Sequence, residues 1–224
     1  MAEENYAYTD EEGVFLVKLA RETVETIVTS QTVLEVPEEV PPKLQEESGV
    51  FVTLNKITSG QVRIGPSGQQ LRGCIGRPYP QFPLVKATID SAIDAATHDP
   101  RFPPVVTQEL DQLIVEVTAL TPPVLLETET PQDRLHAIKI GRDGLLIESD
   151  TRYGPRRGLF LPQVPIEWHW DEKEYLVELC GKAGLPSDYW LRPETNLYTF
   201  QGEIFAEETP RGDISRKVLT PESQ

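Results

Sequence analysis

The chain has 224 residues, of which 36 are acidic and 21 are basic, so its formal charge at pH 7 is -15. A chain of this length buries a hydrophobic core without help from disulfides. The negative charge repels phosphate groups at long range, which argues against broad binding to nucleic acids or anionic membranes unless a local basic patch overrides it. With only two cysteines, no signal-like N-terminus and no long apolar run, the sequence predicts a cytoplasmic protein with reduced thiols.

The first predicted helix begins at a capping box formed by Thr9 and Glu12. Apolar residues then recur on one helical face, and we expect that face to pack on a sheet. The segment 35–48 is acidic and rich in proline, which predicts an ordered surface arm instead of a helix. Strands are predicted over Gly49–Leu54 and Leu71–Ile75, joined through a turn at 65–68.

The middle of the chain continues this alternation of elements. Pro83 suits the first turn of a helix that ends before Asp99, and residues 98–104 form a stiff proline-containing loop. Residues 114–120 alternate in polarity, as in a strand with one solvated side. The residues on either side of Gly141–Gly144 predict a hairpin, and 159–161 predict a further short strand.

The last third carries a second capping signal, at Asp171 and Glu174, for a helix that stops at Gly184. A strand over 197–205 is expected to return to the main sheet. Together these patterns predict an α+β fold: a mixed or antiparallel sheet with flanking helices, and a smaller β-rich subdomain. We assign residues 1–124 and 171–208 to the larger subdomain, 125–170 to the smaller one, and 209–224 to a flexible tail.

Six segments, in order, resemble the AMMECR family over most of residues 10–207. They are GVFVTL at 49–54, LRGCIG at 71–76, DPRFPP at 99–104, EVTALTPP at 116–123, LPQV at 161–164 and CGKAGL at 180–185. The resemblance implies an α+β protein of two subdomains, the larger of which carries residues 71–76. The family has no settled activity. Its members are often fused to, or encoded beside, Memo-type proteins and radical SAM enzymes, which implies a role in a shared pathway.

The segment Leu71–Gly76 is the candidate functional site. Cys74 is predicted at or near a strand end between two glycines, where another group can approach its thiol closely. If the strand is regular, Arg72 and Cys74 share one face of a cleft, where the arginine would contact an anion. The ligand-contacting residues expected here are Arg72, Gly73, Ile75, Gly76, Asp99 and Arg101. In the alternative interpretation, Cys74 is a buried apolar residue and the glycines serve packing.

A catalytic interpretation adds His98 as a general base for Cys74, oriented by Asp99. The alternative is a structural role, in which Asp99 caps or closes the preceding helix, Arg101 pairs with a carboxylate and Phe102 packs into the core. No metal site or cofactor is expected, because the three histidines are far apart and no nucleotide-binding glycine pattern is present.

Three other groups are weaker candidates. Arg142, Arg152, Arg156 and Arg157 could bind an anion or RNA, but neighbouring carboxylates favour a solvated loop. Trp168 and Trp170 could stack on a ligand or fix a junction, and Cys180 belongs to the core face of its helix.

The sequence therefore predicts an enzyme, or an enzyme-associated factor, that binds a small polar or anionic metabolite at 72–76. The competing hypothesis is a non-catalytic interaction module for a Memo-type or radical SAM protein.

Overall fold

The computed structural model describes residues 7–57 and 69–217 of the chain. These residues form two compact units. Residues 7–57, 69–120 and 203–217 form unit 1, and residues 121–202 form unit 2, so the chain passes between the units twice. The turn expected at 65–68 lies outside the described residues.

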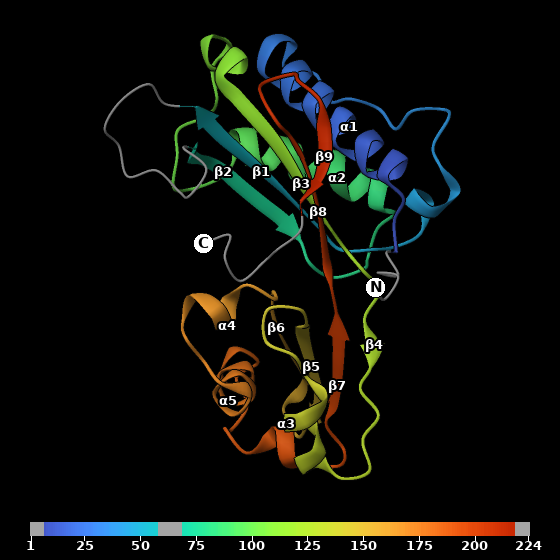
Figure 1. Ribbon diagram of the computed structural model, residues 1–224, viewed down its shortest axis with the longest axis vertical. Coiled ribbons are helices and arrows are strands. Elements are labelled where there is room, and N and C mark those ends of the chain that lie inside the picture. Colours follow the sequence, from blue (N-terminus) through green and yellow to red (C-terminus); the bar gives the residue numbers. More distant parts are fainter. Residues whose placement is uncertain (1–6, 58–68, 218–224) are drawn as a thin grey trace. The chain divides into compact units, whose positions relative to one another are not determined.

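Unit 1 contains a five-stranded sheet with the strand order β2-β1-β3-β8-β9 (Figure 1). Its strands are β1 (Val50–Ile57), β2 (Gln69–Arg77), β3 (Leu113–Leu120), β8 (Gly202–Glu207) and β9 (Ile214–Lys217). Strand β1 pairs antiparallel with both β2 and β3. Alternate residues of β1 are fully buried, so one face of the sheet belongs to the core and the other does not.

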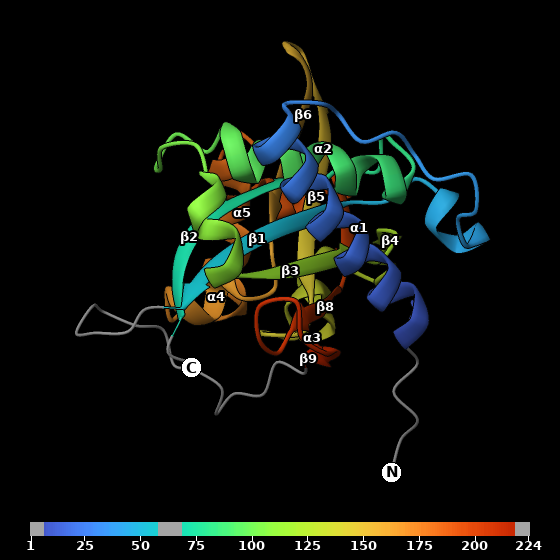
Figure 2. The same cartoon turned by 90° about the horizontal axis from the view of Figure 1, so that it is seen from above.

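Two helices, α1 (Asp10–Ser30) and α2 (Leu84–Thr97), cover the buried face. Both contribute to the same apolar cluster as the buried residues of β1 and β3, and Figure 2 shows them side by side over the sheet. The expected capping box starts α1: the Glu12 amide donates to the Thr9 hydroxyl, and the Thr9 amide donates to the Glu12 carboxylate. We call this side of the sheet the helix face and the opposite side the open face.

Unit 2 contains a four-stranded sheet with the order β4-β7-β5-β6. Its strands are β4 (Val124–Leu125), β5 (Gly144–Thr151), β6 (Gly154–Phe160) and β7 (Asn196–Phe200). Helix α5 (Glu172–Lys182) begins at the expected Asp171–Glu174 capping box and packs on this sheet through Leu176, Leu179 and Cys180. The short helices of the two units are α3 (Arg134–Ala137), α4 (Val164–Glu167), η1 (Pro42–Gln45), η2 (Thr107–Gln112), η3 (Pro131–Asp133) and η4 (Tyr189–Leu191).

The predicted hairpin around 141–144 is wrong. Residues 138–140 form no strand, because the chain turns back there. The Lys139 amide donates a hydrogen bond to the Asp143 carboxylate at 2.9 Å, and Gly141 within this tight turn has φ +81°. Strand β5 instead pairs with β6 and β7. The real hairpin turn lies between Thr151 and Gly154.

The C-terminal third also differs from expectation. Residues 196–207 form two strands in different sheets, β7 and β8, instead of one strand of the main sheet. Within the expected tail, 214–217 form β9, which pairs antiparallel with β8. Helix α5 and strand β7, which we expected in the larger subdomain, belong to unit 2 because they pack on β5 and share its apolar cluster.

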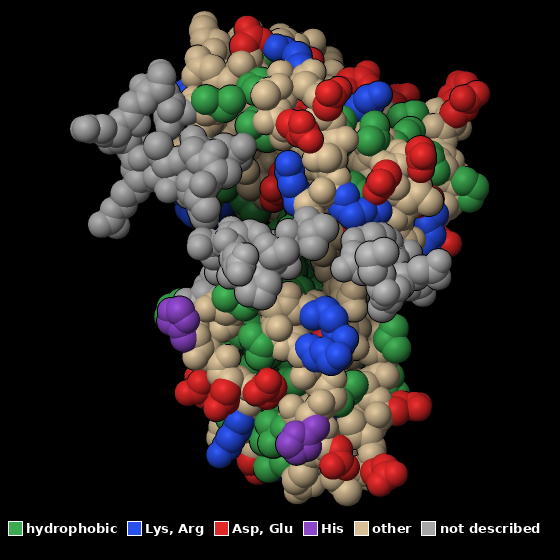
Figure 3. Space-filling model, in the orientation of Figure 1, with side chains coloured by type: hydrophobic (Ala, Val, Ile, Leu, Met, Phe, Trp, Pro, Cys, Tyr) green, Lys and Arg blue, Asp and Glu red, His purple; other side chains and the backbone are tan. Residues whose placement is uncertain are grey.

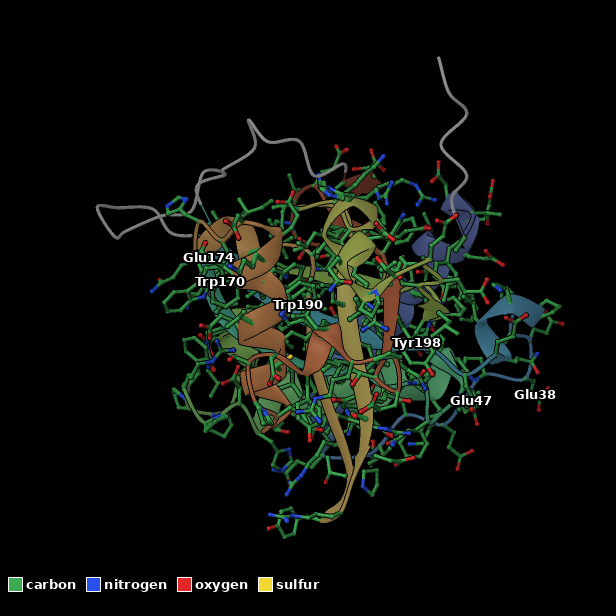
Figure 4. All side chains as sticks on the ribbon, turned by 90° about the horizontal axis from the view of Figure 1, so that it is seen from below. Glu38, Glu47, Trp170, Glu174, Trp190 and Tyr198 are labelled. Carbon is green, nitrogen blue, oxygen red and sulfur yellow. The ribbon has the colours of Figure 1, made fainter. Side chains whose placement is uncertain are left out.

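The arm at 35–48 is ordered and largely extended within unit 1, with η1 as its one described helical turn. Its Leu44 side chain is fully buried, which fixes the arm to the core. Glu38 lies at the outer part of the arm (Figure 4).

Candidate functional site

Strand β2 is an edge strand of the five-stranded sheet, and Cys74 lies well inside it, three residues before its end at Arg77. An edge strand exposes backbone groups that can pair with another chain. At Cys74 both groups are already bound: the amide donates to the Asp99 carboxylate at 2.8 Å, and the carbonyl accepts from the Arg101 guanidinium at 3.1 Å. The loop after α2 therefore covers this part of the edge.

Asp99 holds this loop together. Its carboxylate also accepts the Arg101 backbone amide at 3.1 Å and the Arg101 guanidinium at 3.0 and 2.7 Å. Hydrogen bonding from Arg101 keeps the pKa of Asp99 well below its usual range. The Asp99 side chain is 2% exposed, whereas that of Arg101 is 53% exposed. The loop thus presents a half-exposed guanidinium in a fixed orientation beside β2.

The Cys74 side chain lies on the open face, because its partner in the ladder, Thr53, alternates with the core residues of β1. The Cys74 residue is half-buried, and its sulfur accepts a hydrogen bond from the Thr53 hydroxyl at 3.3 Å. Burial raises the pKa of the thiol, and the Thr53 hydrogen bond and the charge of Arg101 offset this only in part. Cys74 is therefore a protonated thiol at neutral pH.

The row of side chains on the open face continues to β3. Thr53 pairs with Cys74 on one side and with Glu116 on the other, so Cys74, Thr53 and Glu116 lie side by side on three adjacent strands. Glu116 is half-buried, and burial raises the pKa of its carboxyl group. In the part of the chain that the structure describes, this carboxyl has no hydrogen-bond or ion-pair partner. We call these three residues the polar row.

Arg72 does not share the open face with Cys74. A β-bulge places Arg72 as the extra residue of β2 between the pairs formed by Leu71 and Gly73. Its guanidinium donates to both oxygens of Glu109 at 2.9 Å, and Lys56 donates to the same carboxylate. Since the Arg72 side chain is only 11% exposed, it fixes the position of η2 and is not a free anion contact.

Three further residues of the predicted site, Gly73, Ile75 and Gly76, also pack against other parts of unit 1. A Cβ atom on Gly73 would lie 2.2 Å from the Ala95 carbonyl oxygen of α2, and one on Gly76 would lie 2.2 Å from the Phe51 ring. Ile75 packs against the core of unit 1. The space beside the two glycines is therefore filled by a helix and by an aromatic ring, so it is not open to a ligand.

The proposed Cys-His-Asp arrangement is absent from this site. His98 is 70% exposed and its Nδ1 lies 2.7 Å from the Thr97 hydroxyl and 3.3 Å from the Asp94 carboxylate. Asp99 binds Cys74 and Arg101 instead of orienting His98. His98 is thus not placed as a base for Cys74.

The other candidates lie in unit 2. Arg142 pairs with Asp143 and Arg157 with Glu148, which agrees with a solvated, neutralised surface, and acidic and basic side chains are mixed over the visible faces of both units (Figure 3). Trp168 and Trp170 stack at 6.0 Å between ring centroids. Trp170 lies near the start of α5 beside Glu174, and Trp190 follows its other end (Figure 4). Cys180 is fully buried, as its position in the helix predicted.

Sequence reasoning missed Thr53 and Glu116. Both lie in segments quoted for the family resemblance, but only the strand register brings them beside Cys74. Among residues 7–57 and 69–217, no three His, Cys, Asp or Glu side chains converge to hold a metal ion. No helix in these ranges is both long and apolar enough to cross a bilayer.

Comparison with known proteins agrees with the resemblance. The AMMECR1 family model matches residues 17–205. A protein of Thermococcus kodakarensis is 55% identical over 214 residues, covering 96% of this chain and 99% of that protein. A protein of Methanocaldococcus jannaschii is 46% identical over 211 residues, covering 94% and 98% respectively. The crystal structure of an uncharacterized protein from Pyrococcus horikoshii matches with a TM-score of 0.75 and 51% identity, over 96% of this chain and all of that one (100%). The chain belongs to the AMMECR1 family.

Proposed function

We propose that this protein binds a small polar metabolite with an anionic group on the open face of unit 1, beside Cys74. One observation carries the proposal. Arg101 is 53% exposed, yet the almost fully buried Asp99 holds its guanidinium in place. A cation that is oriented before binding loses little conformational entropy when an anion arrives. Arg101 therefore takes the role that the sequence assigned to Arg72.

The thiol of Cys74 acts in this site as a contact and not as an activated nucleophile. Nucleophilic cysteines have depressed pKa values, whereas burial raises the pKa of Cys74. Its sulfur already accepts the Thr53 hydroxyl. An enzyme built on this site would thus use Cys74 for substrate contact, and an enzyme-associated factor would use it for recognition alone.

The protonated thiol also favours the second candidate, a non-catalytic module that binds a Memo-type or radical SAM protein. Such a partner would dock on the open face of unit 1. It would not add a strand at Cys74, because Asp99 and Arg101 occupy the backbone groups there.

The test is the alkylation rate of Cys74 by iodoacetamide as a function of pH, with the modified residue identified by peptide mapping. Cys180 is fully buried and is the internal control, since it should react only after unfolding. Measurable reaction of Cys74 in the folded protein, with a midpoint above the value of about 8.5 for a free thiol, supports an accessible contact residue. No reaction at any pH at which the protein stays folded would exclude a ligand site beside the thiol.

The two candidate roles are separated by a purification experiment. In the module, the variant Arg101→Gln keeps a stoichiometric protein partner, because its docking does not depend on one anion contact. In the metabolite-binding protein, any small molecule that co-purifies with the wild-type chain is lost from Arg101→Gln. His98→Ala is the matched control, because His98 lies in the same loop and its described side-chain polar contacts are to Thr97 and Asp94.

A further inference from the structure

The polar row on the open face ends in the carboxyl group of Glu116, whose role the proposed function does not explain. Glu116 lies two strands away from Cys74, with Thr53 between them. Adjacent strands are about 4.8 Å apart, so the Glu116 and Cys74 positions are separated by about 10 Å along the row. Arg101 lies beyond Cys74, at the outer edge of β2.

Among residues 7–57 and 69–217, no group forms a hydrogen bond or ion pair with the Glu116 carboxyl. Its neighbour in the row, Thr53, donates its hydroxyl to Cys74 and not to Glu116. Lys217 of β9 is on the open face as the ladder partner of Ile204, and it is the charged group in the described chain that acts on Glu116. It forms no described ion pair with the carboxyl. A half-buried carboxyl without such a partner is costly unless something pairs with it.

The helix face shows the contrast. There the carboxylates of Glu109 and Glu207 are each bound by an arginine and by a backbone amide. Glu116 belongs to the same unit, but it faces the other way and lacks these contacts. Its carboxyl therefore has no described role in holding unit 1 together.

We infer that the site of the proposed function recognises a zwitterionic molecule, whose anionic group binds Arg101 and whose ammonium or other cationic group binds Glu116. Glu116 forms one end of the polar row, and Arg101 lies beyond the other end, past Cys74. The molecule would extend across β2, β1 and β3 and pass over the thiol of Cys74 and the hydroxyl of Thr53. This inference rests on the proposed function and adds the chemical class of the ligand.

The test uses Cys74 as a reporter of the local charge. Its rates of reaction with cationic 2-aminoethyl methanethiosulfonate and anionic 2-sulfonatoethyl methanethiosulfonate are measured at one pH, so that thiol ionisation cancels in the ratio. Glu116→Gln should lower the cation-to-anion ratio about tenfold, since one charge at about 10 Å in a partly wet environment changes each rate about threefold in opposite directions. Arg101→Gln should raise the ratio by a similar factor.

Two controls keep the test decisive. Glu22→Gln removes an exposed charge from α1, which packs on the helix face, and should leave the ratio unchanged. Glu116→Asp keeps the charge and should keep most of the preference. If Glu116→Gln does not fold, the wild-type ratio is measured against KCl and must move toward that of free cysteine as salt screens the site.

The outcomes separate the inference from the function on which it rests. A reactive Cys74 whose ratio is the same in wild type and Glu116→Gln overturns the role of Glu116 but leaves a site at Cys74 and Arg101. A Cys74 that reacts with neither reagent overturns both.

Discussion

The loop that Asp99 closes is predicted to be a main source of stability for the edge of unit 1. In Asp99→Ala the backbone amides of Cys74 and Arg101 lose their acceptor, and the Arg101 guanidinium loses its partner. A hydrogen bond to a charged group contributes about 1.5–3 kcal/mol. The two amide bonds alone therefore give about 3 kcal/mol, and we assign little more to the guanidinium, which is half-exposed and screened by solvent.

Asp99→Asn is the finer perturbation. An amide has one acceptor oxygen in place of two, so only one side of the loop keeps its hydrogen bonds. We expect a loss of about half that of Asp99→Ala, or about 1.5 kcal/mol. His98→Ala, at an exposed neighbour, should change the free energy of unfolding by less than about 0.5 kcal/mol.

The assay is urea unfolding followed by far-UV circular dichroism of the helices. All three tryptophans lie within residues 121–202, so their fluorescence reports unit 2 and not the site of this change. The pH dependence supplies a second measure. The pKa of Asp99 is lower in the folded protein, so its stabilisation is present above the unfolded value of about 3.9 and is lost as the pH falls further.

The difference between wild type and Asp99→Asn should therefore be greatest at neutral pH and should shrink below about pH 4. A loss smaller than about 1 kcal/mol for Asp99→Ala at pH 7 would refute the reasoning, because the carboxylate would then contribute no more than a surface ion pair.

Three further changes test other parts of the structure. Glu109→Gln should lower the free energy of unfolding by about 1–2 kcal/mol at pH 7. Hydrogen bonding from Arg72 lowers the pKa of Glu109 to about 2. Urea unfolding followed by circular dichroism should therefore show the difference from wild type shrinking as the pH falls from about 4.3 toward that value. Arg134→Leu removes a buried guanidinium that donates to carbonyls of the 190–195 loop, and unfolding followed by tryptophan fluorescence should show a loss of about 2–4 kcal/mol. Thr9→Ala removes the cap of α1 and should cost about 1 kcal/mol by urea unfolding.

The helix caps, which depend on local sequence, were predicted correctly. The capping boxes at Thr9 and Asp171 and the stop at Gly184 depend on residues a few positions apart. The apolar face of each long helix is set by its own periodicity. The hairpin around 141–144 failed for a local reason as well, because Asp143 folds back onto Lys139 and ends the extended conformation before a strand can form.

The sequence predicts a candidate site at residues 71–76, but it does not predict how the side chains around that segment are arranged. The bulge that turns Arg72 to the helix face exists only because β2 must pair with β1. The neighbours of Cys74 on the open face, Thr53 and Glu116, are set by the register between strands far apart in the chain. The role of Asp99 depends on a loop that returns to the edge of β2. None of these arrangements leaves a periodic pattern in the sequence.

The glycines of the central segment provide a last test of what that segment is for. Gly73→Ala places a methyl group 2.2 Å from the Ala95 carbonyl oxygen, which is helix backbone, whereas Gly76→Ala places it 2.2 Å from the ring of half-buried Phe51. A ring can rotate aside and a helix must shift as a whole, so Gly73→Ala should cost more than Gly76→Ala, about 3 against about 1 kcal/mol by urea unfolding.

The cause of each penalty is separable by a double-mutant cycle with Phe51→Ala. Removing the ring should relieve Gly76→Ala and leave Gly73→Ala unchanged, so only the first pair should show a coupling energy, of about 1 kcal/mol. Equal coupling in both pairs, or none, would mean that the contacts of β2 with Phe51 and α2 are not those described. With the coupling as expected, both glycines are explained by folding alone, and the proposed ligand contacts are left to the side chains beside them on the open face.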